Sequence, residues 1–380
     1  MSHCADLGAF GDFGDYTSRL RNATSFEEEL LLQCQVPICS ALWGLGIPDL
    51  SGIGVTVGYL TSTFLGPFLS FLVLAIPSSR PHLQKIFSEG LEIFFDSAVY
   101  FAFAIQVATI TTLVPKDFQA QKTAFGDYEV RIAGLVSVIC LLPLLCPVGL
   151  LPFLNTEKKD AKARASHRLT LFTITVILSF YPFLSQSIHA FAKTQIGEGN
   201  GEGGVTYITD QEWAKLTNLC FKGSSTNALN NNEHNIIRAF QLLASLSILL
   251  FTLGALTPPG LRRLDENYGK SAVREIVSQK LEKITEIVTE DIVWLRYILV
   301  IIPILLVVPL FWGFWKLRVL QAGLSQGVAQ YYEGDEWGFG QVMAITIFLP
   351  VIAEMYFVWR RGPQEQFLGD EKREEVERKN

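Results

Sequence analysis

The sequence lacks the short motifs with which many soluble enzymes hold nucleotides, metals or nucleophiles. It contains no P-loop, no Gly-x-Ser-x-Gly motif and no paired-histidine metal motif. It also lacks the Asp-Asp-x-x-Asp and Asn-Asp-x-x-Asp runs that hold the magnesium ions of a prenyltransferase or an ionising cyclase. The sequence therefore gives no support for nucleotide, serine-hydrolase or metal chemistry, and we expect neither a metal nor a cofactor.

Charged side chains are scarce as well. Only 18% of the 380 residues are charged, whereas 49% are hydrophobic, and the mean hydropathy is positive. Together with several uncharged apolar runs, this composition is typical of a polytopic membrane protein. The net charge of −6 and the lack of a basic cluster outside the loops argue against nucleic acid as a partner. The first 30 residues lack the apolar core of a cleavable signal peptide.

Seven apolar runs predict an all-α transmembrane bundle of about seven spans. They cover residues 50–76, 87–114, 130–154, 169–192, 236–256, 291–315 and 339–359. Within the third run, Pro143, Pro147 and Pro152 are expected to kink the helix. The sequence shows no internal repeat, which makes an inverted-repeat transporter less favoured.

The runs divide the chain into three parts. Residues 1–48 are expected to form a polar N-terminal lumenal segment, residues 49–360 the membrane domain, and residues 361–380 a charged cytosolic tail. Inside the membrane domain, residues 193–235 are expected to be a lumenal loop that is partly disordered. Residues 262–290 place apolar side chains at helical spacing, which predicts an amphipathic helix on the cytosolic side.

The positions of Lys and Arg predict an N-out, C-in orientation. Most basic residues fall in loops that would then be cytosolic, above all the linker at residues 155–168. In that orientation the glycosylation sequon Asn22-Ala-Thr24 is outside. The protein is accordingly expected to be a glycoprotein of the endoplasmic reticulum membrane.

Cysteine usage fits the same orientation. Cys4, Cys34, Cys39 and Cys220 all fall outside, where one or two disulfides are plausible, and four cysteines allow three pairings. The remaining two cysteines, Cys140 and Cys146, lie in the third span and are interpreted as packing residues.

The second span carries carboxylates into the membrane. Glu89, Glu92 and Asp96 are spaced i, i+3, i+7 and lie on one face of a helix. For Glu89 a simple complement to the helix dipole is the favoured interpretation. Asp96 lies roughly 10 Å deeper, and function and a structural ion pair are equally favoured for it.

Four charged side chains from several spans are expected at a similar depth in the membrane, which suggests that they form one pocket. Glu92, Asp96, Glu354 and Arg296 would meet in the inner leaflet, although Arg296 would equally well serve only to neutralise one of the acids. A carboxyl group desolvated among aromatic rings stays protonated more readily, which suits a general acid. We therefore predict catalytic acids at Asp96, Glu92 and Glu354, and substrate contacts from Phe95, Tyr100, Phe103 and Arg296.

A resemblance points the same way. Residues 39–54, CSALWGLGIPDLSGIG, and the seven-span outline resemble polytopic proteins of filamentous fungi. The hydropathy and acid-bearing helices are similar to those of membrane-bound terpene cyclases of fungal meroterpenoid pathways. The resemblance implies protonation-initiated cyclisation of a farnesyl or epoxyfarnesyl chain on a lipophilic small-molecule substrate, in contact with membrane lipid and without metal or redox cofactor.

Two other classes fit the sequence. A seven-span receptor or sensor agrees with the outside N-terminus, the sequon and a disulfide to Cys220. In a transporter or channel, Asp96, Glu92 and Arg296 would relay protons or ions.

Overall fold

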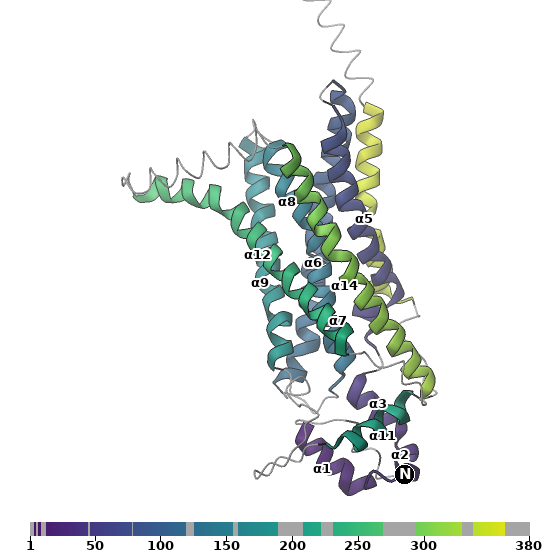
Figure 1. Cartoon of the computed structure of the whole chain (residues 1–380). Helices are drawn as coiled ribbons and strands as arrows, with labels where there is room; N and C mark the ends of the chain where they lie inside the picture. The colour runs from purple at the N-terminus through teal and green to yellow at the C-terminus, as the bar shows by residue number, and fades with distance from the viewer. Residues whose placement is uncertain are drawn as a thin grey trace, which may run out of the picture.

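The chain forms, in a computed structural model, a bundle of long helices with a small group of helices at one end (Figure 1). The structure describes residues 4, 7–8, 13–44, 46–77, 79–118, 125–154, 159–188, 208–221, 231–268, 293–328 and 337–361. All regular secondary structure in these ranges is helical, and the predicted all-α class is confirmed.

Seven segments are long and apolar enough to cross a membrane, as predicted. They are Pro48–Ala75, Pro81–Asp117, Asp127–Val148, His167–Ser185, Asn232–Leu256, Val300–Gly327 and Gly340–Arg361. The helices that build them are α4 (Pro48–Ser51), α5 (Ile53–Ala75), α6 (Pro81–Asp117), α7 (Asp127–Ile139), α8 (Leu142–Leu154), α9 (Lys159–Ile188), α12 (Asn231–Tyr268), α14 (Val293–Gly327) and α15 (Phe339–Thr346), the last followed by helical residues 349–361.

The third span is the centre of the bundle. Its most apolar window is 94% buried by protein, whereas those of the other six spans are 17–50% buried. The helix breaks at Cys140 and Leu141, directly before Pro143, whereas α8 continues through Pro147. Cys140 and Cys146 of this span are buried free thiols, which confirms their interpretation as packing residues.

A buried amide joins this central span to α6. The Gln106 side chain donates to the carbonyl of Ser137 at 2.8 Å, and the Ser137 hydroxyl donates back to Gln106 Oε1 at 2.8 Å. Both residues are almost fully buried. Each polar group is thus satisfied where no water reaches it.

The sixth span ends later than predicted. Trp312 and Trp315, beside the predicted end at residue 315, are about half exposed, at 45% and 49%, as is typical of tryptophan at a membrane boundary. However, α14 continues to Gly327 because its buried stripe continues on the opposite side of the helix. That stripe comprises Phe314, Leu317, Leu320 and Leu324.

Four helices form a cap at one end of the bundle. The cap consists of α1 (Phe13–Thr24), α2 (Glu28–Gln33), α3 (Gln35–Trp43) and α11 (Asp210–Phe221), seen at the bottom of Figure 1. Two disulfides hold it, Cys4–Cys34 and Cys39–Cys220. The prediction of disulfides among these four cysteines is confirmed, and the second bond joins segments 181 residues apart.

Helix α11 corrects the prediction of a loop over residues 193–235. Its N-terminus is a capping box, in which the Thr209 hydroxyl accepts from the Glu212 N–H and the Glu212 carboxylate accepts from the Thr209 N–H at 2.8 Å. Glu212 also accepts two hydrogen bonds from Arg21 of α1. Although partial burial raises the pKa of Glu212, its bonds from Arg21 and Thr209 lower that pKa below its usual value overall.

Two other predicted segments fall largely outside the described residues. The helix α12 extends into the segment predicted as amphipathic, up to Tyr268, whereas residues 269–292 lie outside. The predicted tail likewise lies outside the described residues from position 362.

The start of the first span packs closely on the seventh. The Gly54 N–H donates to Gln341 Oε1 at 2.9 Å, and both residues are buried. A Cβ added at Gly54 would lie 2.4 Å from the Gln341 Cβ and 2.8 Å from its backbone oxygen. Only glycine lets the two backbones approach so closely.

We expect Gly54→Ala to destabilise the bundle by about 1–3 kcal/mol, because backbone as well as side chain must move to admit the methyl group. Thermal unfolding of the detergent-purified protein measures the loss. The control is Gly254→Ala on α12, where an added Cβ meets nothing within 4 Å. A Gly54→Ala variant as stable as the Gly254→Ala variant would contradict the close packing.

Candidate functional site

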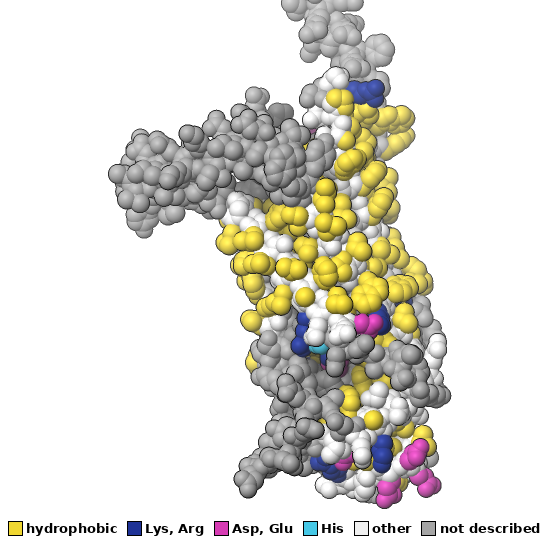
Figure 2. Space-filling model, viewed as in Figure 1, with side chains coloured by type: hydrophobic (Ala, Val, Ile, Leu, Met, Phe, Trp, Pro, Cys, Tyr) yellow, Lys and Arg dark blue, Asp and Glu magenta, His cyan; other side chains and the backbone are white. Residues whose placement is uncertain are grey.

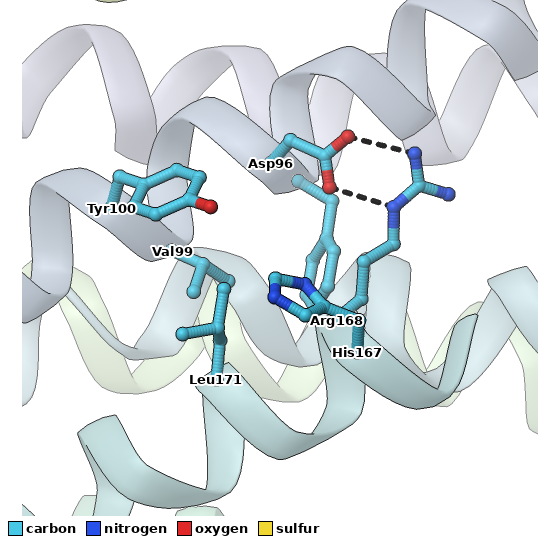
Figure 3. A pocket seen from close by; sticks show the side chains of 7 residues that line it. Asp96, Val99, Tyr100, His167, Arg168 and Leu171 are labelled. Carbon is cyan, nitrogen blue, oxygen red and sulfur yellow. Dashed lines mark hydrogen bonds and ion pairs between the residues drawn. The ribbon is translucent and has the colours of Figure 1, made fainter. Parts of the chain in front are cut away.

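Arg168 of α9 binds both acids that the second span carries into the membrane. Its Nε and Nη2 donate to the two carboxylate oxygens of Asp96 at 2.6 and 2.7 Å (Figure 3). Its Nη1 donates to Glu92 Oε2 at 2.9 Å. The Asp96 contact is the bidentate fork in which guanidinium and carboxylate match best.

Helical spacing explains why one arginine reaches both acids. Glu92 and Asp96 are four residues apart on α6 and face the same way, toward α9. Arg168 lies in the first turn of the fourth span, which starts at His167. Its side chain is 12% exposed, compared with 37% for Asp96, so the contact is mostly but not fully screened from solvent.

The structure gives Asp96 the partner Arg168, which the sequence did not predict, whereas the predicted pairing with Arg296 stays a prediction. Depth along a span can be derived from sequence, and Arg296 and Arg168 both lie near a span end at the same side of the bundle. Which helix packs against α6 depends on tertiary packing, and α9 takes that place. The side chain of Arg296 lies outside the described residues.

A second polar contact joins the same two helices at their other end. The Tyr181 hydroxyl of α9 donates to Asp117 Oδ2 of α6 at 3.0 Å. Asp96 and Asp117 are 21 residues apart, or roughly 32 Å along a helix, close to the thickness of a bilayer's hydrocarbon core. The two contacts between α6 and α9 are therefore separated by about the thickness of the hydrocarbon core.

A hollow of about 220 Å³ opens beside the Asp96–Arg168 pair. Its lining residues come from α6 and α9 and are Phe95, Asp96, Val99, Tyr100, His167, Arg168 and Leu171. In Figure 3 the polar ends of Tyr100 and His167 face the space in front of the Asp96 carboxylate. Tyr100 is 52% exposed, so the hollow opens toward the surroundings of the bundle and not into its centre. We call this hollow the α6–α9 groove.

The other predicted site residues stand in different relations to the groove. Phe95 lines it and packs on Phe172 of α9, with ring centroids 6.3 Å apart. Glu354 is half-buried on the last helix, and both it and Glu92 interact electrostatically with Glu89 of α6. The convergence of Glu92, Asp96, Glu354 and Arg296 in one pocket stays a prediction. Glu354 does not line the groove, and neither does the half-buried Phe103.

Four groove residues were not predicted from sequence, the apolar Val99 and Leu171 and the polar His167 and Arg168. The two polar residues are the last two of the basic linker, residues 155–168, which the sequence analysis uses only as an orientation signal. The available clue was position, because they lie in the first turn of a span, at the level where a charge is half solvated. Within the described residues, no group of three or more His, Cys, Asp or Glu side chains is placed to hold a metal ion.

The geometry determines what the groove residues can do. A carboxylate that accepts both hydrogen bonds of a guanidinium fork is in its anionic form, and it has no proton to give. Asp96 is therefore suited to stabilise positive charge. The imidazole of His167 is a lining group that is able to serve as a general acid and base.

Comparison with known proteins identifies no relative: no family model matches the chain, and no curated protein or solved structure matches it.

We expect Asp96 and Arg168 to be energetically coupled. Asp96→Ala and Arg168→Ala should each destabilise the protein by roughly 1–3 kcal/mol, between the values typical of exposed and of buried pairs. The double variant should be no less stable than the worse single variant, as measured by thermal unfolding in detergent.

The matched control combines Asp96→Ala with Tyr181→Phe at the opposite end of the same helix pair. Those two losses should add, because distant sites without shared partners act independently. Additive losses for Asp96→Ala and Arg168→Ala as well would refute the coupling.

Proposed function

We propose that this chain is an integral membrane enzyme that binds a lipophilic substrate in the α6–α9 groove and cyclises its prenyl or epoxyprenyl chain. One observation carries the proposal. A hollow that opens at the side of the bundle is lined by a fixed carboxylate, an imidazole, a phenol and apolar side chains. A substrate dissolved in the bilayer reaches such a groove sideways, without passing through water.

The residues of the groove suit separate tasks. The Asp96–Arg168 pair offers an acceptor and donors to the polar head group of the substrate, while Phe95, Val99 and Leu171 offer apolar contact to its chain. Tyr100 adds an aromatic face, which attracts positive charge.

In the proposed reaction, the protonated imidazole of His167 gives its proton to the epoxide oxygen, and the C–O bond opens. The π electrons of a neighbouring alkene form the new C–C bond, and the positive charge moves onto the next carbon of the chain. Loss of a proton from that carbocation to the neutral imidazole forms the final double bond and restores the donor. Asp96 remains an anion throughout and stabilises the passing positive charge. The assignment of Asp96 thus changes from the predicted proton donor to an electrostatic role.

The reaction is tested by expressing the chain in a host supplied with prenylated, epoxidised aromatic precursors and analysing the products. We expect a cyclised product with wild type, and a loss of about 10²- to 10⁴-fold in turnover with His167→Gln, which removes the acid. Asp96→Asn should also lose turnover, because the variant lacks the charge.

Asp117→Asn is the matched control, since it makes the same change on the same helix at its other contact with α9. It should keep turnover within about threefold of wild type. Absence of any cyclised product from all precursors, or equal turnover in His167→Gln and wild type, would reject the proposed function.

The cap favours a second candidate function, that of a seven-span receptor or sensor. A disulfide-bonded group of helices held over one end of the bundle is a rigid surface that a ligand from outside would meet first. The two candidates differ in where the chemistry occurs, because the α6–α9 groove lies roughly 32 Å along α6 from Asp117, which is at the end of that helix nearest the cap. Neighbouring genes for a prenyltransferase and an epoxidase would favour the cyclase.

For orientation, we propose that the cap is lumenal, with the protein in the endoplasmic reticulum. Disulfides persist in oxidising compartments, and both disulfides of the described residues are in the cap. The sequon residue Asn22 is exposed on α1 of the cap. The positive-inside bias supports the same orientation.

Glycosidase treatment of the protein from microsomes should lower its apparent mass, and Asn22→Gln should abolish that shift. The control substitution is Asn235→Gln, at an exposed asparagine outside any sequon, which should leave the shift unchanged. A cap that proteases remove from sealed, right-side-out microsomes would show the reverse orientation.

A further inference from the structure

A cluster of basic side chains lies where α7 and α12 begin, at the cap end of the bundle. Arg131 of α7 donates to Asp127 one turn earlier, with Nε 2.7 Å from Oδ2. The guanidinium of Arg131 also contacts the ring of His234 on α12, with Nη1 3.2 Å from Nε2. Arg238, one turn further along α12, interacts electrostatically with both Arg131 and Asp127. We call Arg131, His234 and Arg238 the basic cluster.

The described acids do not neutralise this cluster. Asp127 is 6% exposed, accepts a hydrogen bond from Arg131 and interacts electrostatically with Arg238. One carboxylate thus stands against two guanidinium groups, which leaves an excess of one positive charge. The nearby carboxylate of Glu233 pairs with Lys316 of α14. Arg238 makes no hydrogen bond or ion pair with any described residue, and its side chain is exposed. Like charges held this close repel one another, and an anion placed between them removes the repulsion.

The cluster lies at the level of lipid head groups. Figure 2 shows basic side chains and a histidine at the lower edge of the apolar band, between that band and the cap. The fifth span starts at Asn232, so His234 and Arg238 lie in its first two turns. Arginine at this level reaches the phosphates of the adjacent leaflet.

The surface next to the cluster fits a fatty-acyl chain. Counting in steps of four from Arg238 along α12 gives Leu242, Leu246 and Leu250, which share its helix face. These leucines are 55%, 52% and 59% exposed. An apolar stripe thus continues from the cluster toward the middle of the membrane. A phospholipid would contact both the cluster and this stripe, whereas a free phosphate ion would contact the cluster alone.

We propose that the basic cluster and the leucine stripe of α12 form a binding site for a phospholipid of the cap-side leaflet. The lipid phosphate lies between Arg131 and Arg238, and one acyl chain lies along Leu242, Leu246 and Leu250. The site lies at the cap end of the bundle, away from the α6–α9 groove, and it is independent of the chemistry proposed there.

Native mass spectrometry of the delipidated, detergent-purified full-length protein tests the site. Dioleoylphosphatidylglycerol is added, and dioleoylglycerol and inorganic phosphate are the comparison probes, each lacking one half of the lipid. We expect saturable binding of one tightly held phosphatidylglycerol, and weaker binding of both comparison probes.

Arg238→Gln should weaken that binding about fivefold, the effect typical of one arginine near an anionic lipid surface. Because Arg238 makes no ion pair with the described residues, this variant should fold normally, which thermal unfolding checks. Arg19→Gln is the control, since Arg19 lies on α1 of the cap and its side chain is 46% exposed.

Each other outcome overturns the proposal. Unchanged affinity in a folded Arg238→Gln variant would show that the cluster does not hold the lipid. Binding of dioleoylglycerol as tight as that of phosphatidylglycerol would show an apolar surface without head-group recognition. Equally tight binding of inorganic phosphate would show a free-anion site.

Discussion

A charged side chain at a membrane boundary needs a partner, and in this chain the partner usually comes from a different span. Arg168 joins α9 to α6 through Asp96 and Glu92, and the Tyr181–Asp117 bond joins the same helices at their other end. Lys116–Glu129 joins α6 to α7, and Lys316–Glu233 joins α14 to α12. Apolar side chains pack with many neighbours, but such polar contacts accept few geometries. They therefore set which helices meet and at what height.

Sequence predicts the features of this fold that depend on local properties. Hydropathy along a window predicts seven spans because each span must be apolar over its own length, and cysteine positions predict disulfides at one end. The pairing of Asp96 with Arg168 could not be derived, since it depends on which helix packs against α6. Helix α11 was a different failure. Its capping box, Thr209 to Glu212, is readable in the sequence, but the glycine-rich residues before it made the whole segment look like a loop.

The two ends of the bundle differ in rigidity and in exposure. The cap end has two disulfides, the aromatic contact of Trp43 with Trp213 and Phe221, and several ion pairs. The groove end has an ion pair that is partly open and an aromatic side chain, Tyr100, that faces outward. Molecules from the membrane therefore have easier access to the groove end. The rigid cap end holds the spans in register, so that Asp96 and Arg168 keep their geometry without a covalent bond nearby.

The third span has no lipid-facing side in the finished bundle, and this bears on how the protein is made. Helices α5 and α6, which cover one part of α7 and α8, precede them in the chain, whereas α9, α12 and α14, which cover the rest, follow them. During synthesis the third span thus enters the bilayer before that second part of its cover exists, and for that period lipid contacts the uncovered sides. A span with a polar stripe matched to its final neighbours would be poorly retained at that stage. After the charged first turns that end at Arg131, its sequence is apolar apart from Ser137 up to Val148, and we infer that this composition serves its insertion as much as its place at the centre.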